Sequence, residues 1–142
     1  HRLEFIREWG GASWYNDSIA TSPERTIAAL ESFDEPIILL AGGRDKDLPW
    51  DKLAALIHHK VDHLVLFGEA AELIKKIVGE VQPGMKPDTI DQVKDLKTAV
   101  KAASTRVQPG DVVLLSPGGT SFDEFNDFEH RGRRFKQWVN EL

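Results

Sequence analysis

Residues 111–132 read Asp-Val-Val-Leu-Leu-Ser-Pro-Gly-Gly-Thr-Ser-Phe-Asp-Glu-Phe-Asn-Asp-Phe-Glu-His-Arg-Gly. The apolar run Asp111–Leu115 predicts a fully buried strand. The small residues at 116–119 should end the strand and let the backbone approach a ligand closely. Thr120, Ser121 and Asp123 can then cap a helix, whose free N–H groups favour an anion. The stretch indicates either a site for a negatively charged small molecule or simply a tight turn after a core strand.

Upstream of this stretch, short apolar runs alternate with amphipathic segments, which is typical of an α/β domain. We expect strands at Leu3–Trp9, Ala12–Asn16, Pro36–Ala41, His63–Phe67, Thr89–Val93 and Asp111–Leu115. We expect one helix to begin at Ser22 and others to cover Trp50–His58, Ala70–Val78, Leu96–Thr105 and about Phe122–Val139. The pair Gly10-Gly11 should form a tight hairpin turn, since glycine readily adopts positive φ angles. The sequence thus predicts a Rossmann-like three-layer domain with a mostly parallel six-stranded sheet and an N-terminal antiparallel hairpin.

The side chains of the expected helices indicate which positions are buried. Three apolar residues of one helix should face the core: Leu73, Ile74 and Ile77. Three phenylalanines spaced i, i+3, i+6 should pack along the last helix: Phe122, Phe125 and Phe128. That helix contains Gly132, where its pattern allows an interruption, and the basic run at 130–136 is expected to be a solvated face.

Composition limits the class of protein. The 142 residues, 41% hydrophobic and 29% charged, fit one ordinary globular domain. No apolar run approaches the roughly 18–20 residues that cross a bilayer, so no membrane partner is expected. A net charge of −5 argues against nucleic-acid binding, and the absence of cysteine excludes disulfides and thiolate zinc sites. His58, His59 and His63 straddle a helix end and a strand start, so no metal site is expected either.

Three of the expected strands lead into loops with small or polar residues, at Asp17, Gly42 and Ser116. Open α/β sheets collect their ligands at such carboxyl ends. Asp17 can accept hydrogen bonds from a ribose and Thr21 offers a hydroxyl, although both also suit an ordinary helix-entry turn. Lys46 is a mobile point charge suited to a carboxylate, although a solvated loop lysine is the common alternative.

Four stretches resemble, in the same order, motifs of the third domain of the Mur ligases: His1-Arg2-Leu3-Glu4, residues 16–22, residues 41–46 and residues 111–132. Together they cover essentially the whole chain, and they resemble no other domain of that family. Within the family, the loop at residues 16–22 and the segment at residues 116–122 are similar to the matching segments of the enzymes that add D-glutamate.

The resemblance implies that residues 1–142 are the amino-acid-binding, ATP-covering C-terminal domain, without the central ATPase and N-terminal UDP-binding domains. The whole enzyme would be a cytoplasmic, monomeric ligase that adds D-glutamate to UDP-N-acetylmuramoyl-L-alanine in peptidoglycan biosynthesis. It would use ATP and Mg²⁺, with the magnesium ligands mainly in the central domain. The substrate carboxylate would become an acyl phosphate, which the amine of D-glutamate attacks. The fragment alone is expected to be inactive and to hold no catalytic residue.

The resemblance also implies roles for individual residues. Those expected to bind D-glutamate are Thr21, Lys46, Ser121, Phe122 and Phe128. Those expected to bind ATP are His1, Arg2 and Asp17. Ile19 stands where D-glutamate-adding enzymes often carry lysine, so it is given no role in holding an anion. Arg44 is a possible second cation, but it has no counterpart in the family.

Two alternatives stay open. One is the equivalent domain of another Mur ligase or of folylpolyglutamate synthetase, although the Asp-Asn-Pro-Arg motif of a diamino-acid ligase is absent. The other is a stand-alone nucleotide- or amino-acid-binding module. The chain has neither a Gly-x-x-x-x-Gly-Lys-[Ser/Thr] phosphate loop nor a Gly-x-Gly-x-x-Gly fingerprint, which argues against a free-standing dinucleotide enzyme.

Overall fold

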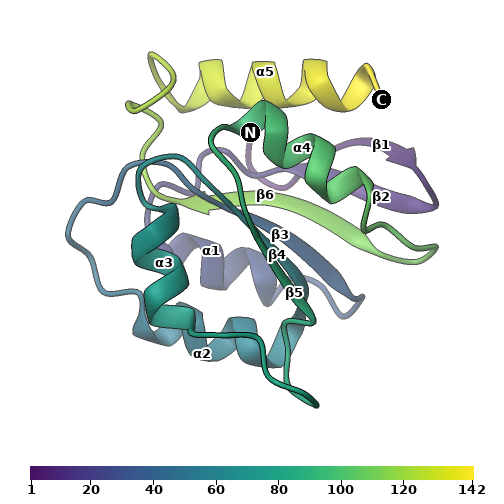
Figure 1. The fold of residues 1–142 in the computed structure, drawn as a ribbon. Coiled ribbons are helices and arrows are strands. Elements are labelled where there is room, and N and C mark those ends of the chain that lie inside the picture. Colours follow the sequence, from purple (N-terminus) through teal and green to yellow (C-terminus); the bar gives the residue numbers. More distant parts are fainter.

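Six strands and five helices make up the computed structural model, which describes residues 1–142 (Figure 1). In chain order they are β1 (Glu4–Trp9), β2 (Ala12–Asn16), α1 (Pro23–Leu30), β3 (Ile37–Gly42), α2 (Asp51–Lys60), β4 (Val61–Phe67), α3 (Ala71–Val78), β5 (Thr89–Gln92), α4 (Leu96–Ser104), β6 (Val112–Gly118) and α5 (Phe128–Asn140). This order confirms the predicted α/β class. None of the helices combines the length and apolar character that crossing a bilayer requires.

The strands form one sheet in the order β1-β2-β6-β3-β4-β5. As predicted, β1 pairs antiparallel with β2 and all other neighbours are parallel. Gly10 and Gly11, with φ angles of 64° and 80°, form the hairpin turn. Positive φ at both turn residues matches the right-handed twist of the paired strands. β6 is the last strand in the sequence, yet it lies between β2 and β3.

Helices cover both faces of the sheet and make three layers, as predicted (Figure 1). α1, α2 and α3 pack on one face, and α4 and α5 pack on the other. Successive side chains of a strand point to opposite faces. In β3, Leu39 therefore packs with the first group of helices, while Ile38 and Leu40 pack with the second. Because both faces are buried, the strand reads as an unbroken apolar run.

The last strand and the last helix differ from the prediction. β6 continues to Gly118 instead of ending at Leu115, because Gly118 still pairs with Gly42 of β3. α5 begins at Phe128 instead of near Phe122, and it is continuous to its end. The segment between β6 and α5 is therefore a loop.

Three carboxylates explain why this loop is not helical. Asp123 accepts a hydrogen bond of 3.1 Å from the N–H of Glu69, and Glu124 accepts one of 3.3 Å from the N–H of Leu96. Both side chains thus serve elements far away in sequence. Asp127 caps α5 instead, because its carboxylate accepts a hydrogen bond of 2.7 Å from the N–H three residues later. The three residues predicted to cap the helix do not do so: Thr120, Ser121 and Asp123.

Two predictions of apolar burial are wrong. Leu73 is 38% exposed, because α3 turns Ala71, Ile74 and Val78 toward the core instead. Phe122 is 61% exposed, because it lies in the loop before α5 and not on the helix. Neighbouring positions on a helix point about 100° apart, so one wrong position in the stripe moves a side chain from core to surface.

Replacing Leu39 with alanine tests the core between sheet and helices. The side chain is 0% exposed, and its removal should leave a cavity that lowers the free energy of unfolding by about 2–5 kcal/mol. Urea denaturation followed by tryptophan fluorescence measures the loss. Leu73→Ala is the matched control and should cost less than about 1 kcal/mol. Equal losses from the two variants would contradict the core as described.

Candidate functional site

The loops after β2, β6 and β3 leave three neighbouring parallel strands at the same edge of the sheet. Backbone hydrogen bonds join them. The N–H of Gly118 donates to the carbonyl of Ala20 at 2.9 Å, and Arg44 and Thr120 exchange two bonds of 2.9 and 2.8 Å. The loop segments brought together are 17–21, 43–46 and 118–121.

Glycines permit this close approach of the loops. Gly43 has a φ angle of 92°, and a Cβ there would lie 2.3 Å from the carbonyl oxygen of Thr120. A Cβ on Gly119 would lie 2.5 Å from the carbonyl oxygen of Gly42. Neither position has room for a side chain. The glycine-rich turn predicted to approach a ligand therefore also packs one loop against another.

Asp17 is buried at the base of the β2 loop, with 4% of its surface exposed. Its carboxylate accepts hydrogen bonds from the N–H of Leu3 at 3.0 Å and from the hydroxyl of Ser116 at 2.7 Å. Burial raises the pKa of Asp17, and the two hydrogen bonds offset part of that rise. The bond from Leu3 fixes the N-terminal segment against the β2 loop.

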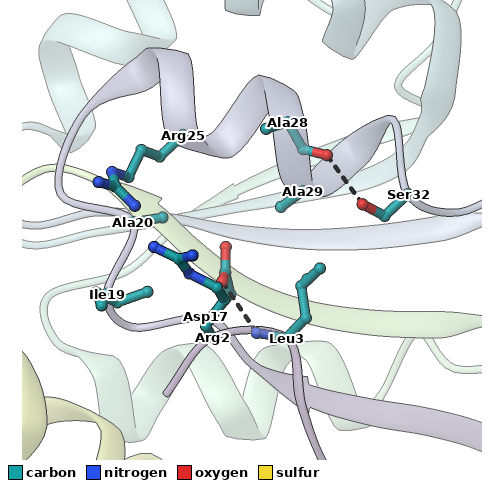
Figure 2. Close-up of a pocket in the computed structure, with 9 residues that line it drawn as sticks. All are labelled: Arg2, Leu3, Asp17, Ile19, Ala20, Arg25, Ala28, Ala29 and Ser32. Atoms are coloured by element: carbon teal, nitrogen blue, oxygen red, sulfur yellow. Dashed lines mark hydrogen bonds between the residues drawn. The ribbon is translucent and has the colours of Figure 1, made fainter.

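A cavity of about 230 Å³ opens beside Asp17 (Figure 2). It is lined by Arg2, Leu3, Asp17, Ile19, Ala20, Arg25, Ala28, Ala29 and Ser32. The guanidinium groups of Arg2 and Arg25 point to the same end of the cavity, and neither forms an ion pair (Figure 2). Two free cations and a carboxylate suit a ligand that carries both anionic groups and hydroxyls.

Thr21 and Lys46, from the loops after β2 and β3, lie together. The Nζ atom of Lys46 is 3.4 Å from the hydroxyl oxygen of Thr21, and the lysine side chain is exposed. An exposed ammonium beside a hydroxyl is suited to a carboxylate. Arg44, the possible second cation, instead makes two hydrogen bonds of 3.0 Å to the carboxylate of Glu69. Lys46 is therefore the better candidate of the two cations.

The remaining predicted residues lie around the start of α5. Ser121 is 2% exposed, and its neighbour Phe122 extends its ring into solvent. The ring of Phe128 packs edge-on against the imidazole of His1, with ring centres 6.0 Å apart. The carbonyl of Phe128 accepts a hydrogen bond of 2.7 Å from the hydroxyl of Ser18. His1, which the resemblance assigns to ATP, and Phe128, which it assigns to D-glutamate, are thus neighbours.

Sequence reasoning missed Arg131. The basic run around it is predicted to be solvated, but the Arg131 side chain is 0% exposed. Its guanidinium donates to the hydroxyl and the carbonyl of Ser18 at 2.9 and 2.8 Å and to the carbonyl of Gly119 at 3.0 Å. One signal could have found it: Arg131, Phe135 and Val139 share the buried face of α5 at i, i+4, i+8.

The edge offers cations, hydroxyls and backbone N–H groups to a small anionic molecule. The buried hydroxyl of Thr120 has no hydrogen-bond partner, so it adds an unused donor there. No three His, Cys, Asp or Glu side chains gather anywhere in the structure as ligands for a metal ion.

Comparison with known proteins shows to which family the sequence is similar. A model described as "Mur ligase, glutamate ligase domain" matches residues 1–119. The UDP-N-acetylmuramoylalanine–D-glutamate ligase of Acetivibrio thermocellus is 48% identical over 145 residues, which cover 100% of this chain and 31% of that protein. The ligase of the same name from Syntrophus aciditrophicus is 48% identical over 139 residues, which cover 98% of this chain and 29% of that protein. The chain thus spans about a third of the length of these relatives.

Solved structures share the fold at lower identity. The MurF ligase of Thermotoga maritima in complex with ADP matches with a TM-score of 0.60 and 22% identity, covering 99% of this chain and 31% of that one. The FolC protein of E. coli in complex with ADP matches with a TM-score of 0.64 and 15% identity. The match covers 98% of this chain and 31% of that one. At these identities the likeness establishes the fold alone.

Replacing Asp17 with asparagine tests the burial of its charge. Burial raises the pKa of Asp17 in the folded state, so its ionisation destabilises the fold as the pH rises from the unfolded value of about 3.9 through the folded value. Asparagine can still accept from Leu3 and can donate to Ser116. At about pH 7 we therefore expect Asp17→Asn to be at least as stable as the wild type, with the difference shrinking toward about pH 4.

Urea denaturation at several pH values measures this difference for Asp17→Asn. A variant that is less stable than the wild type at every pH would mean that the ionised carboxylate stabilises the loop. That result would contradict the expected sign.

Proposed function

The chain belongs to the Mur ligase family, and from this membership we propose that it is the C-terminal domain of a ligase that uses ATP to add D-glutamate to UDP-N-acetylmuramoyl-L-alanine. This reaction is a step of peptidoglycan biosynthesis. One observation carries the proposal: the loops after β2, β3 and β6 meet at one edge and bring the ammonium of Lys46 to 3.4 Å from the hydroxyl of Thr21.

D-glutamate carries two carboxylates, which would be held at opposite ends. Lys46 and Thr21 would bind one carboxylate through a charge-assisted hydrogen bond and a hydroxyl. Ser121 and the backbone at Phe122 and Phe128 would bind the other. The reciprocal bonds between Arg44 and Thr120 keep these two ends adjacent. The amine would remain free to attack.

ATP would lie at the cavity beside Asp17. Arg2 would bind phosphate oxygens, and the carboxylate of Asp17 would accept hydrogen bonds from the ribose hydroxyls. His1, which packs against Phe128, would lie between the two ligands. Arg25 lines the same cavity and adds a second positive charge near the phosphates.

The chemistry would be divided between domains. The 142 residues hold no phosphate loop, so a central domain would supply that loop and the ligands for Mg²⁺, and an N-terminal domain would bind the UDP group. In this scheme the substrate carboxylate becomes an acyl phosphate, and the amine of D-glutamate displaces phosphate to form the amide. The present domain would close over the acyl phosphate and exclude water from it. We place the whole enzyme in the cytoplasm as a monomer.

The alternative is the equivalent domain of another Mur ligase or of a folylpolyglutamate synthase. Such proteins share the fold with TM-scores of 0.60 to 0.64 but only 15–22% identity. The relatives at 48% identity carry the name of the D-glutamate ligase. Substrate choice depends on the loop residues more than on the fold, so the closer relatives support D-glutamate.

Lys46→Ala in the full-length ligase tests the amino-acid site. Removing a charge-assisted hydrogen bond costs about 1.5–3 kcal/mol, so the KM for D-glutamate should rise roughly ten- to a hundred-fold. The KM for ATP should change much less. Lys46→Arg should restore only part of the affinity, because a planar fork does not replace a point charge. Steady-state kinetics with each substrate varied in turn measures both constants.

Lys101→Ala, an exposed lysine on α4, is the matched control and should leave both KM values unchanged. An unchanged KM for D-glutamate in Lys46→Ala would reduce Lys46 to a solvated loop lysine. Arg44 would then be the next residue to test, together with its partner Glu69.

The 142-residue chain alone should form no amide. It lacks the phosphate loop that positions the γ-phosphate of ATP. An ADP-release assay with ATP, D-glutamate and UDP-N-acetylmuramoyl-L-alanine should therefore stay at background, while the full-length ligase is active in the same assay. D-glutamate-dependent release of ADP by the chain alone would overturn the domain assignment.

A further inference from the structure

Arg131 is a buried cation without a carboxylate partner. Its side chain is 0% exposed, and none of the ion pairs in the structure includes it. Its three hydrogen-bond acceptors are neutral: the hydroxyl and carbonyl of Ser18 and the carbonyl of Gly119. Burying a charge costs free energy that a carboxylate usually offsets. Here no carboxylate forms an ion pair with the guanidinium.

The two carboxylates whose charges act on Arg131 also serve as hydrogen-bond acceptors elsewhere. Asp123 accepts a hydrogen bond from the N–H of Glu69, and Glu124 accepts one from the N–H of Leu96. Burial lowers the pKa of Arg131 to about 10, while the negative charges of Asp123 and Glu124 act in the opposite direction. At neutral pH the guanidinium therefore remains protonated.

The guanidinium lies directly behind the three loops of the candidate site. A Cβ on Gly43 would be 3.0 Å from its Nη1 atom, which shows how closely it approaches the β3 loop. It contacts Ser18 of the β2 loop and Gly119 of the β6 loop. In the sequence, each of these three contact residues lies within three positions of a residue proposed to bind D-glutamate. These binding residues are Thr21 in the β2 loop, Lys46 in the β3 loop and Ser121 in the β6 loop.

We propose that Arg131 sets the affinity of this edge for the carboxylates of the amino acid, through a positive charge that acts from behind the loops without touching the ligand. This inference rests on the proposed function. A neutral side chain could pack between the same loops, and replacing a buried charge by an apolar residue often leaves stability intact. What a neutral side chain would lack is the positive charge, which acts on an anion in front of the loops. Ile19, which offers no charge, makes this contribution more important.

Three substitutions in the full-length ligase separate the charge from the hydrogen bonds. Arg131→Met and Arg131→Gln remove the charge, whereas Arg131→Lys keeps the charge and loses the planar fork. A unit charge acting across roughly 8 Å at an effective dielectric constant of about 20 changes affinity by about ten- to thirty-fold. The two neutral variants should raise the KM for D-glutamate by that factor. Arg131→Lys should raise it by about three-fold or less, since a point charge remains.

Two further measurements exclude a merely structural effect. The KM for ATP should rise less than that for D-glutamate, because the cavity beside Asp17 lies against α1, on the opposite face of the sheet from α5. Phe135→Leu disturbs the buried face of α5 and keeps the charge of Arg131, so it should lower the melting temperature while leaving the KM for D-glutamate close to that of the wild type.

Several results would overturn the proposal. Equal losses in Arg131→Lys and the neutral variants would mean that the hydrogen-bond fork alone matters. Parallel rises in both KM values would indicate general damage to the loops. Failure of both neutral variants to fold, as judged by circular dichroism, would make the charge a requirement of folding. If the wild-type ligase showed no D-glutamate-dependent release of ADP, the proposed function itself would fail, and that outcome is distinct from the others.

Discussion

β6, the last strand in the sequence, lies between β2 and β3 and joins the two parts of the sheet. β6 makes parallel ladders on both sides, and its residues are buried on both faces of the sheet. The hydrogen bond from Ser116 to Asp17 joins residues 99 positions apart in the sequence. The loops that carry Thr21 and Lys46 therefore meet across β6, a strand from the far end of the chain. The candidate site is a product of the sheet order and not of any single motif.

Two buried charges of opposite sign support this edge and are accommodated differently. Asp17 accepts hydrogen bonds from a backbone N–H and a hydroxyl, while Arg131 donates to a hydroxyl and two carbonyls. Neither forms an ion pair with the other or with any other residue. Buried charges are normally paired, and exceptions to this rule occur mostly at functional sites. A carboxylate and a guanidinium held apart in this way suit a site for ligands that are themselves charged.

The fold leaves the choice of substrate to the loops. Ligases with names different from those of the closer relatives share the same architecture at 15–22% identity. A shared architecture therefore does not fix the ligand, which depends on the side chains of each site. The resemblance of the sequence places Ile19 of the β2 loop where D-glutamate-adding enzymes often carry lysine. At this edge Lys46 supplies an exposed positive charge in front of the loops, and Arg131 holds a buried one behind them.

The local features of the fold follow from the sequence alone. Glycine at both turn positions predicted the hairpin, unbroken apolar runs predicted strands buried on both faces, and strand–helix alternation predicted the layers and which loops share an edge. The ligand roles of Thr21, Lys46 and Ser121 remain predictions from resemblance. The start of α5 at Phe128, instead of near Phe122, follows from the folded structure alone. The reason is long-range hydrogen bonding: Asp123 and Glu124 bind backbone N–H groups 54 and 28 residues away, which no local pattern encodes.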